Sequence, residues 1–339
     1  MKIAITVDPE IPVPPQLYGG IERIVDMLVQ GLVDRGHKIT LFAHPNSKVP
    51  CQLVAYPGRK SQNTIDFIRN TFTVSRVLLT GNYDLIHSFG RLGYMMPLLP
   101  TSLPKLMSYQ REPSLIQIKK ALKCAKKDTL TFTGCSEYIA SQIRPFALSY
   151  AIPNGVPSKT YEFKSHVQAK APLVFLGRVE EIKGIHIAIE VAKKSGRKLI
   201  IAGNIPEGKQ DYFENRIKPY IDNDQIKYIG PVDDFQKNEL LGKALAFLMP
   251  ITWNEPFGIV MAEALACGTP ILAFPRGATP EVVQAGVNGY LCHSIEEMSR
   301  AVQAVALLNR ADCRRIYEER FSDRAIVDQY ESLYRQLTC

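Results

Sequence analysis

The feature that most restricts the possible folds is the alternation of short apolar segments with amphipathic ones along the 339 residues of the chain. Strands are predicted, for example, at Lys2–Val7, Lys38–Ala43 and Lys105–Tyr109, and almost every predicted strand is followed by a helical pattern. In the helix predicted at 20–36, apolar residues recur at spacings of three and four. Strands that alternate with helices form parallel sheets covered on both faces, so the sequence predicts an α/β fold.

The alternation is interrupted once, and the interruption divides the chain. After the turn at 152–157, the segment 158–172 is polar and shows no clear period. We therefore expect an N-terminal domain over residues 1–157, a linker over 158–172 and a C-terminal domain over 173–321, because 339 residues are long for one core. Ligands of doubly wound domains bind beyond the carboxyl ends of the strands, so functional residues are expected in the loops there.

The net charge of +8 lies almost wholly in the first half of the chain. Residues 1–160 contain 19 Lys and Arg against 10 Asp and Glu, whereas residues 161–339 contain 22 against 23. We therefore expect the N-terminal half to contact an anionic partner. The sequence has no apolar run long enough for a membrane-spanning helix and no signal-peptide pattern at its start, and its seven cysteines are scattered. These features favour a cytoplasmic protein with reduced thiols.

Two loops of the C-terminal half have residue types suited to a phosphate and a sugar. The loop 177–184 contains Arg178 and Lys183, whose cationic groups can neutralise phosphate oxygens. Glu255 lies just before a predicted helix, and Glu263 lies two turns inside that helix. A carboxylate can accept two hydroxyl donors, as on a sugar or ribose, although a structural salt bridge is an alternative role for Glu263.

A glycine pair follows the first predicted strand. Gly19 and Gly20 open the next helix, where the missing Cβ atoms and the free backbone N–H groups suit a phosphate. An ordinary helix start explains this pair equally well. The pattern is not G-x-G-x-x-G, so a dinucleotide is not indicated.

Taken together, the motifs resemble those of the retaining glycosyltransferases of family 4, which have the GT-B fold. The resemblance covers nearly the whole chain, in order, through these segments: Tyr18–Glu22, Ile152–Val156, Gly177–Val179 with Lys183 and Gly184, Glu255 with Glu263, and Gly277–Glu281. It implies two Rossmann-like, doubly wound domains that face each other across a cleft. The N-terminal domain would lie on the acceptor side and the C-terminal domain would bind the nucleotide sugar, while a C-terminal helix over 322–339 would pack on the first domain.

The resemblance also implies roles for individual residues. Glu255 would bind the donor sugar near its reacting carbon, and Arg178 and Lys183 would neutralise the diphosphate leaving group. His87 is a further catalytic candidate, but the family often has a second histidine where this chain has Phe89, and a lone histidine is more often structural. Both roles of His87 therefore stay open.

The remaining implied site residues fall into two groups. Donor binding would involve the following: Gly19, Gly20, Val232, Phe257, Gly258, Ile259, Val260 and Glu263. Acceptor-side candidates are Tyr18, Arg91 and Arg111.

The function implied is the transfer of a hexosyl group, with retention, from a UDP- or GDP-sugar to a glycan, lipid-linked or small-molecule acceptor. The alternatives are a nucleotide-sugar epimerase on the same fold and a non-catalytic nucleotide-sugar-binding protein. We expect no cofactor and no metal, because the D-x-D pattern at Asp222–Asp224 lies in a predicted solvated turn. A nucleic-acid partner is not expected, since no known binding module is present.

The segment Ser114–Asp128 combines lysines with apolar residues. Five lysines lie in it: Lys119, Lys120, Lys123, Lys126 and Lys127. A basic amphipathic helix of this kind can lie on an anionic membrane, here the inner face, which would suit a lipid-linked acceptor. A solvated face over the core is the alternative interpretation.

Overall fold

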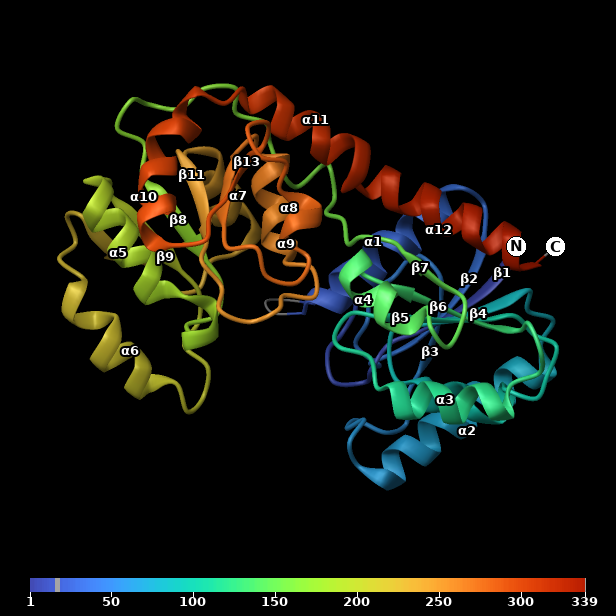
Figure 1. Cartoon of the computed structure of the whole chain (residues 1–339). Coiled ribbons are helices and arrows are strands. Elements are labelled where there is room, and N and C mark those ends of the chain that lie inside the picture. Colours follow the sequence, from blue (N-terminus) through green and yellow to red (C-terminus); the bar gives the residue numbers. More distant parts are fainter. Residues whose placement is uncertain (16–18, 339) are drawn as a thin grey trace. The chain divides into compact units, whose positions relative to one another are not determined.

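The computed structural model describes residues 1–15 and 19–338 of the chain. The chain divides into two compact units (Figure 1). The first unit comprises the residues up to Gly155 and those from Asp323 onward, and the second comprises Val156–Ser322. Each unit is built around a parallel sheet with helices interleaved between its strands, which confirms the α/β fold predicted from the alternation.

The first unit contains a seven-stranded sheet, as far as the chain is described. Its elements are β1 (Lys2–Thr6), α1 (Gly20–Asp34), β2 (Lys38–Ala43), β3 (Gln52–Ala55), α2 (Thr64–Thr80), β4 (Leu85–Ser88), the 3₁₀ helix η1 (Leu92–Leu98), β5 (Lys105–Tyr109), α3 (Leu115–Cys124), β6 (Leu130–Gly134), α4 (Glu137–Ile143), β7 (Ser149–Ala151) and α12 (Asp323–Thr338).

The strand order of this sheet is β3-β2-β1-β4-β5-β6-β7, and every pair is parallel. The chain starts in the middle at β1, moves outward to β3 and then returns to the other side of β1 as β4. In register, Ile3 of β1 pairs with Ile39 on one side and with Leu85 on the other, and Ile3 and Leu85 are fully buried. The reversal between β1 and β4 is a topological switch point, where doubly wound folds bind their ligands.

The second unit contains a six-stranded sheet in its described residues. Its elements are β8 (Leu173–Leu176), η2 (Glu181–Lys183), α5 (Ile185–Ser195), β9 (Leu199–Ala202), α6 (Gln210–Arg216), η3 (Lys218–Tyr220), β10 (Ile226–Tyr228), α7 (Asp234–Gly242), β11 (Ala246–Met249), α8 (Ile259–Ala266), β12 (Ile271–Ala273), α9 (Thr279–Val282), β13 (Gly289–Leu291), α10 (Ile295–Ala304), η4 (Val305–Leu307) and α11 (Arg310–Arg320).

The strand order of the second sheet is β10-β9-β8-β11-β12-β13, again with parallel pairs throughout. The switch point lies between β8 and β11. Strands buried on both faces explain the nearly continuous apolar runs of this half, because helices cover both sides of a parallel sheet. Leu173, Leu199 and Leu248, from three of these strands, are fully buried in one apolar cluster.

The segment 158–172, predicted as a linker, belongs to the second unit. Tyr161 is buried, and its hydroxyl donates to Glu263 Oε1 over 2.7 Å. The guanidinium of Arg310 donates through Nε to the backbone oxygen of Lys164 over 2.7 Å. The segment, which is described at every residue, forms no helix or strand of its own, which explains why its sequence shows no period. Contacts with side chains of α8 and α11 hold it in place instead.

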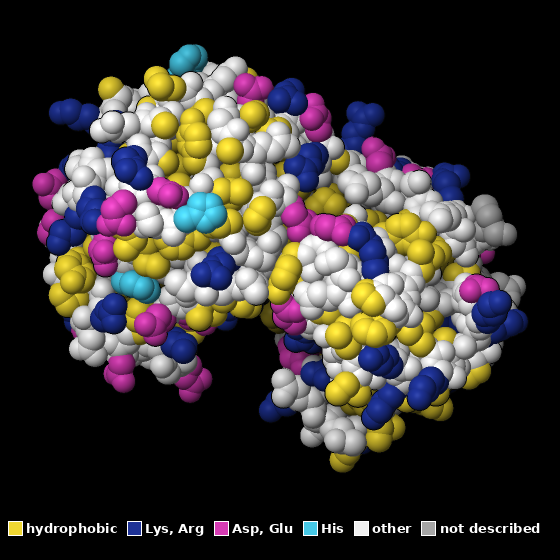
Figure 2. All heavy atoms as spheres, in the orientation of Figure 1, with side chains coloured by type: hydrophobic (Ala, Val, Ile, Leu, Met, Phe, Trp, Pro, Cys, Tyr) yellow, Lys and Arg dark blue, Asp and Glu magenta, His cyan; other side chains and the backbone are white. Residues whose placement is uncertain are grey.

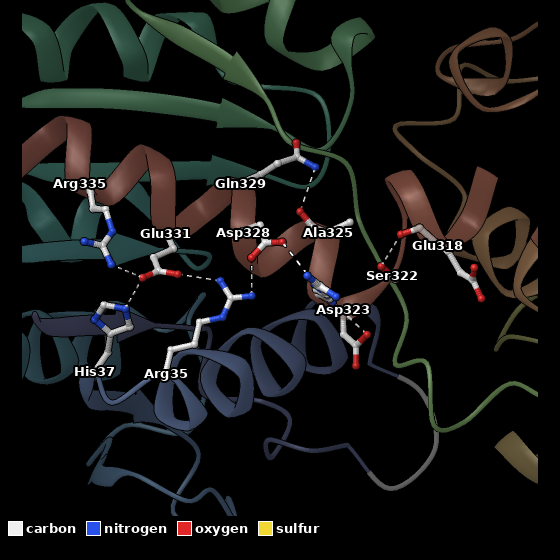
Figure 3. A network of polar contacts seen from close by, with 11 residues as sticks. Arg35, His37, Glu318, Ser322, Asp323, Ala325, Asp328, Gln329, Glu331 and Arg335 are labelled. Atoms are coloured by element: carbon white, nitrogen blue, oxygen red, sulfur yellow. Dashed lines mark hydrogen bonds and ion pairs between the residues drawn. The ribbon is translucent and has the colours of Figure 1, made fainter. Parts of the chain in front are cut away.

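The last helix, α12, packs on α1 within the first unit. Figure 3 shows polar contacts between α12 and the turn that follows α1: Arg35 reaches Asp328 over 2.6 Å and Glu331 over 2.7 Å, and His37 Nε2 lies 3.2 Å from Glu331. On the apolar side, a Cβ atom at Gly31 would come within 2.5 Å of Val327. The glycine therefore permits close approach of the two helices.

Candidate active site

The switch point of the second sheet brings together two loops that are far apart in sequence. One loop follows β8 and the other follows β11, and these strands are parallel neighbours, so both loops leave the same edge. The backbone N–H of Thr252 in the second loop donates to the backbone oxygen of Ile182 in the first over 2.9 Å. This contact fixes the two loops beside each other.

Two of the three predicted catalytic residues of these loops, Lys183 and Glu255, are in direct contact. Lys183 Nζ lies 2.6 Å from Glu255 Oε2, and both side chains are largely buried, with 17% and 11% of their surface exposed. The indole Nε1 of Trp253 donates to the same Glu255 oxygen over 3.1 Å. Lys183 also lies 4.8 Å from the centroid of the Trp253 ring, in reach of a cation–π interaction. A cation and a carboxylate are thus held together at the strand ends.

Glycines hold the backbone around this pair. Gly184 has a φ of 76°, and a Cβ atom there would lie 2.0 Å from the backbone oxygen of Pro250. A Cβ atom at Gly277 would lie 2.3 Å from the backbone oxygen of Glu255, which also accepts a hydrogen bond from the N–H of Ala278 over 2.9 Å. Larger residues at either glycine would displace the loops that carry Lys183 and Glu255.

The helix α8 begins immediately after this loop. Its N-cap, Gly258, has a φ of 80°, and Phe257 before it is buried with its ring centroid 5.8 Å from that of Phe321. Ile259 and Val260 form the first turn, which is half-buried. The first N–H groups of a helix have no intrahelical acceptors and suit an anion, so the predicted donor-binding segment coincides with a helix N-terminus.

Arg178 follows β8 on the same sheet edge, and among the described residues it pairs with Glu180 rather than with Glu255. It lies 3.1 Å from Glu180, and 38% of its side chain is exposed. Val232 follows β10, two strands from β8 on the same edge, and is half-buried. Gly230 in the same turn has a φ of 76° and accepts a hydrogen bond from Gly203 N–H over 2.9 Å.

Glu263 is buried inside α8 and is paired. Its Oε1 accepts hydrogen bonds from Tyr161 over 2.7 Å and from Lys237 Nζ over 2.6 Å. Lys237 lies 3.1 Å from Asp234 as well. The structural salt bridge considered as an alternative role for Glu263 is therefore present, and it leaves a ribose-binding role as a further proposal.

In the first unit, the described acceptor-side candidates lie at the carboxyl ends of β4 and β5. Arg91 follows β4 and Arg111 follows β5, and both line one pocket. Gly19, the N-cap of α1, has a φ of 155°, and a Cβ atom there would lie 2.6 Å from Pro15. Gly20 is the first residue of α1. Tyr18 lies outside the described residues.

His87 is fully buried in β4 between two hydroxyl groups. Its Nδ1 lies 2.6 Å from the Tyr334 hydroxyl on α12, and its Nε2 lies 2.6 Å from Ser108 Oγ. Burial lowers the pKa of His87 to about 3, so the imidazole is neutral. Both ring nitrogens have protein partners, and this arrangement favours the structural role over the catalytic one.

Two family models match the chain in succession. The model described as Glycosyltransferase Family 4 matches residues 18–159, and the model described as Glycosyl transferases group 1 matches residues 159–325. The chain belongs to glycosyltransferase family 4. Spore coat protein SA of Bacillus subtilis is 23% identical over 384 residues, which cover 99% of this chain and all of that protein.

Solved structures agree with the family in fold. Sucrose-phosphate synthase from Thermosynechococcus elongatus has a TM-score of 0.82 at 19% identity, covering 99% of both chains. HepE from Anabaena, solved in complex with UDP and glucose, has a TM-score of 0.74 at 20% identity and covers 98% of this chain and 99% of its own. The GT-B fold class predicted for this family 4 glycosyltransferase is confirmed.

Several polar residues of this glycosyltransferase were not predicted as site residues. Trp253 contacts Glu255, which lies two residues further along the same loop. Tyr161 and Lys237 contact Glu263, but nothing in the sequence shows that their segments meet that helix. In the first unit, burial raises the pKa of Asp8 and that of Glu22. Asp8 lies two residues after β1, at the carboxyl end of a buried strand. This position in the sequence could have identified it as a candidate site residue.

The turn with the D-x-D pattern is satisfied by its own backbone. Asp222 Oδ1 accepts hydrogen bonds from the N–H groups of Ile226, Asp224 and Gln225, and these bonds lower the pKa of Asp222. Among residues 1–15 and 19–338, no three His, Cys, Asp or Glu side chains gather as a metal site would require. Within those same ranges, no helix has the length and apolarity needed to cross a membrane.

Proposed function

We propose that this glycosyltransferase transfers a hexosyl group, with retention of configuration, from a UDP- or GDP-sugar to a glycan, lipid-linked or small-molecule acceptor. The observation that carries the proposal is the Lys183–Glu255 contact at 2.6 Å, beside the N-terminus of α8 at the switch point of the second sheet. The complex of HepE with UDP and glucose supports a nucleotide-sugar donor for a protein of this fold.

The reaction requires stabilisation of an anionic diphosphate as it leaves the sugar. In the proposed mechanism Lys183, Arg178 and the first N–H groups of α8 supply that stabilisation, and the fixed positions of Lys183 and the helix avoid reorganisation during the reaction. Glu255 binds sugar hydroxyls and sets the orientation of the reacting carbon. Glu263 binds the ribose hydroxyls through the carboxylate that otherwise pairs with Lys237.

The contact between Lys183 and Glu255 also explains how the site keeps its geometry when empty. A buried charged group without a partner is costly. Each residue therefore supplies the other with a partner and holds it in place before a donor arrives. The phosphate groups of the donor would then add a second partner for the ammonium group of Lys183.

The proposal is tested by thermal stabilisation of the full chain with UDP, GDP and ADP and with their hexose conjugates, followed by assays of hexosyl transfer to a panel of acceptors. We expect selective stabilisation by UDP or GDP ligands. In Lys183→Ala the stabilisation is expected to fall strongly. Lys198→Ala removes the same charge from an exposed lysine that pairs with Asp224 at 2.6 Å and serves as the matched control. Equal stabilisation of both variants and the wild type would contradict the proposed function.

We further propose that the glycosyltransferase is cytoplasmic and contacts the inner face of an anionic membrane through Ser114–Asp128, the segment that contains α3. Lys119, Lys120 and Lys123 of this helix are exposed, and so is 71% of the Ile116 side chain. Figure 2 shows Lys and Arg side chains lying among hydrophobic ones on the part of the first unit that carries α3. Basic residues combined with exposed apolar ones favour binding to anionic lipid.

Co-sedimentation with vesicles tests this contact. We expect binding to vesicles that contain phosphatidylglycerol, weak binding to pure phosphatidylcholine, and loss of binding when Lys119, Lys126 and Lys127 are replaced by glutamate. The control replaces three exposed lysines of the second unit, Lys194, Lys198 and Lys209, in the same way. Binding that does not depend on anionic lipid would exclude the proposed contact.

A further inference from the structure

A large pocket lies within the first unit between α3, η1 and the carboxyl ends of β4 and β5. Its volume is about 750 Å³, in the range of small-molecule sites. Apolar side chains form much of its lining, among them Phe67, Phe89, Leu92, Met96, Leu99 and Met107. We call this cavity the α3 pocket. An apolar cavity of this size releases ordered water when an apolar chain enters it, which favours such a ligand.

Buried polar atoms without partners lie among the lining residues of the α3 pocket. Within the described parts of the chain, both amide atoms of Gln110, the hydroxyl of Tyr109 and Nε of Arg91 are buried and accept or donate no hydrogen bond. Leaving such groups unpaired costs free energy, so buried polar groups in folded proteins are nearly always satisfied. These atoms therefore indicate a polar group of a ligand at the β4 and β5 end of the pocket.

The charges around the α3 pocket are mostly positive. Arg91, Arg111, Lys120 and Lys123 belong to its lining, and Lys120 and Lys123 make no ion pair with any described acidic residue. The acidic residue of the lining is Glu112, whose carboxylate accepts a hydrogen bond from the Tyr138 hydroxyl. This balance of charges favours a ligand with an anionic group.

We propose that the α3 pocket binds the acceptor, and that this acceptor is an anionic lipid whose apolar chain enters the pocket. The assignment rests on the proposed glycosyl transfer and narrows its acceptor to one chemical class. A free glycan would need many hydrogen-bonding partners, whereas most of the lining is apolar. Gln110, Tyr109 and Arg91 contact the polar part of the lipid, and Lys120 and Lys123 attract its anionic group.

The position of the pocket suits an acceptor. Arg91 follows β4, and Gln110 and Arg111 follow β5, so the polar end of the pocket lies at the carboxyl edge of the first sheet. Ile21 in the first turn of α1 also lines the pocket, two residues after Gly19. The polar head of a bound lipid is thus held at the edge where doubly wound units bind their ligands.

The proposal is tested by calorimetric titration of the full chain with dodecyl phosphate below its micelle concentration, and in parallel with inorganic phosphate and dodecyl maltoside. We expect dodecyl phosphate to bind at least about tenfold more tightly than either, because it alone supplies both the chain and the anion. If dodecyl phosphate binds no more tightly than inorganic phosphate, the pocket does not bind the alkyl chain and the proposal is wrong. If dodecyl maltoside binds as tightly as dodecyl phosphate, the pocket does not recognise an anionic group.

Two variants of α3 distinguish binding inside the pocket from binding to the surface around it. Ala121 lines the pocket, so Ala121→Phe fills part of it and is expected to weaken dodecyl phosphate binding about tenfold, as exclusion of about two methylene groups would. Leu122 lies next to it outside the lining, so Leu122→Phe is the control with unchanged binding. Equal affinities for these two variants would contradict the assignment. If Ala121→Phe does not fold, the comparison of the three ligands on the wild type decides.

Pairs of lysine replacements test the role of the anionic group. Replacement of Lys120 and Lys123 by alanine is expected to weaken dodecyl phosphate binding about threefold at low salt, whereas replacement of Lys194 and Lys198, two exposed lysines of the second unit, leaves it unchanged. Stabilisation by UDP and GDP is measured on the same samples. If the protein binds dodecyl phosphate but neither UDP nor GDP, the proposed nucleotide-sugar donor is wrong and the lipid acceptor is not. If it binds UDP or GDP but not dodecyl phosphate, the lipid acceptor is wrong and the donor is not.

Discussion

Lys183 Nζ and Glu255 Oε2 lie 2.6 Å apart, although 72 residues separate them in the chain. The contact depends on β8 and β11 being parallel neighbours in the second sheet. It joins the group proposed to stabilise the diphosphate to the group proposed to position the sugar. The two residues are therefore expected to act as one unit in catalysis.

Glu255→Gln and Lys183→Ala are each expected to lower kcat/KM for hexosyl transfer by about a hundredfold or more, because each removes part of a preorganised charge arrangement. The double variant is expected to lose little more than either single variant, since groups that act together are not additive. Initial rates of the four proteins test this, and fully additive losses would show that the two residues act independently.

Glu263 is expected to matter for folding as well as for donor binding. Glu263→Ala leaves Lys237 without the carboxylate that lies 2.6 Å away, and we expect a loss of about 3 kcal/mol in the free energy of unfolding. The double variant Glu263→Ala, Lys237→Met should recover much of that loss. Urea unfolding measures both effects, and a Glu263→Ala protein as stable as the wild type would show that the pair contributes nothing.

Glu331 on α12 gives the first unit a predictable response to acid. Hydrogen bonds from Arg335, Arg35 and His37 lower its pKa to about 2, against an ordinary value of 4.5. Because the folded-state pKa is depressed, this stabilisation is fully present above about pH 4.5 and is lost as the pH falls toward about 2. Glu331→Gln should therefore flatten the pH dependence of unfolding in that window.

Chemical denaturation at a series of pH values checks this expectation. Glu319→Gln, at an exposed site on α11, is the matched control and should keep the wild-type slope. Parallel curves for Glu331→Gln and the wild type would show that the contacts of Figure 3 do not couple to folding.

Transfer is expected to proceed without a divalent metal. Lys183, Arg178 and the α8 N-terminus supply positive potential where other enzymes use a cation. Rates measured with and without EDTA, after prior dialysis against chelator, test this. Loss of activity in EDTA that is restored by Mg²⁺ or Mn²⁺ would contradict it.

Local sequence patterns predicted many elements of the fold. The strands at Lys38–Ala43 and Lys105–Tyr109 have the predicted bounds, because buried parallel strands appear as short apolar runs. The helix α2 was not predicted. Its sequence, Thr64–Thr80, is rich in threonine, isoleucine, valine and phenylalanine, which are weak helix formers, and its exposed stripe includes Ile68 and Phe72.

The site could be predicted as a set of residues but not as a geometry. Arg178, Lys183 and Glu255 were identified from their loops, yet their pairing depends on strand order, which places Lys183 with Glu255 and leaves Arg178 with Glu180. Tyr161 shows the same limit, because its segment has no period and only the folded unit brings it to Glu263. Local sequence patterns predict which residues are buried and where helices begin. Contacts between residues that are distant in sequence can be predicted only when the strand order is known.

The central claim is that the second unit binds a nucleoside diphosphate through Lys183. Calorimetric titration of the wild type, Lys183→Ala and Lys198→Ala with UDP and with GDP tests it most directly. We predict that one of the two nucleotides binds the wild type and Lys198→Ala with equal affinity, and that Lys183→Ala binds it about tenfold or more weakly. Failure of both nucleotides to bind, or equal affinity in all three proteins, would contradict the account.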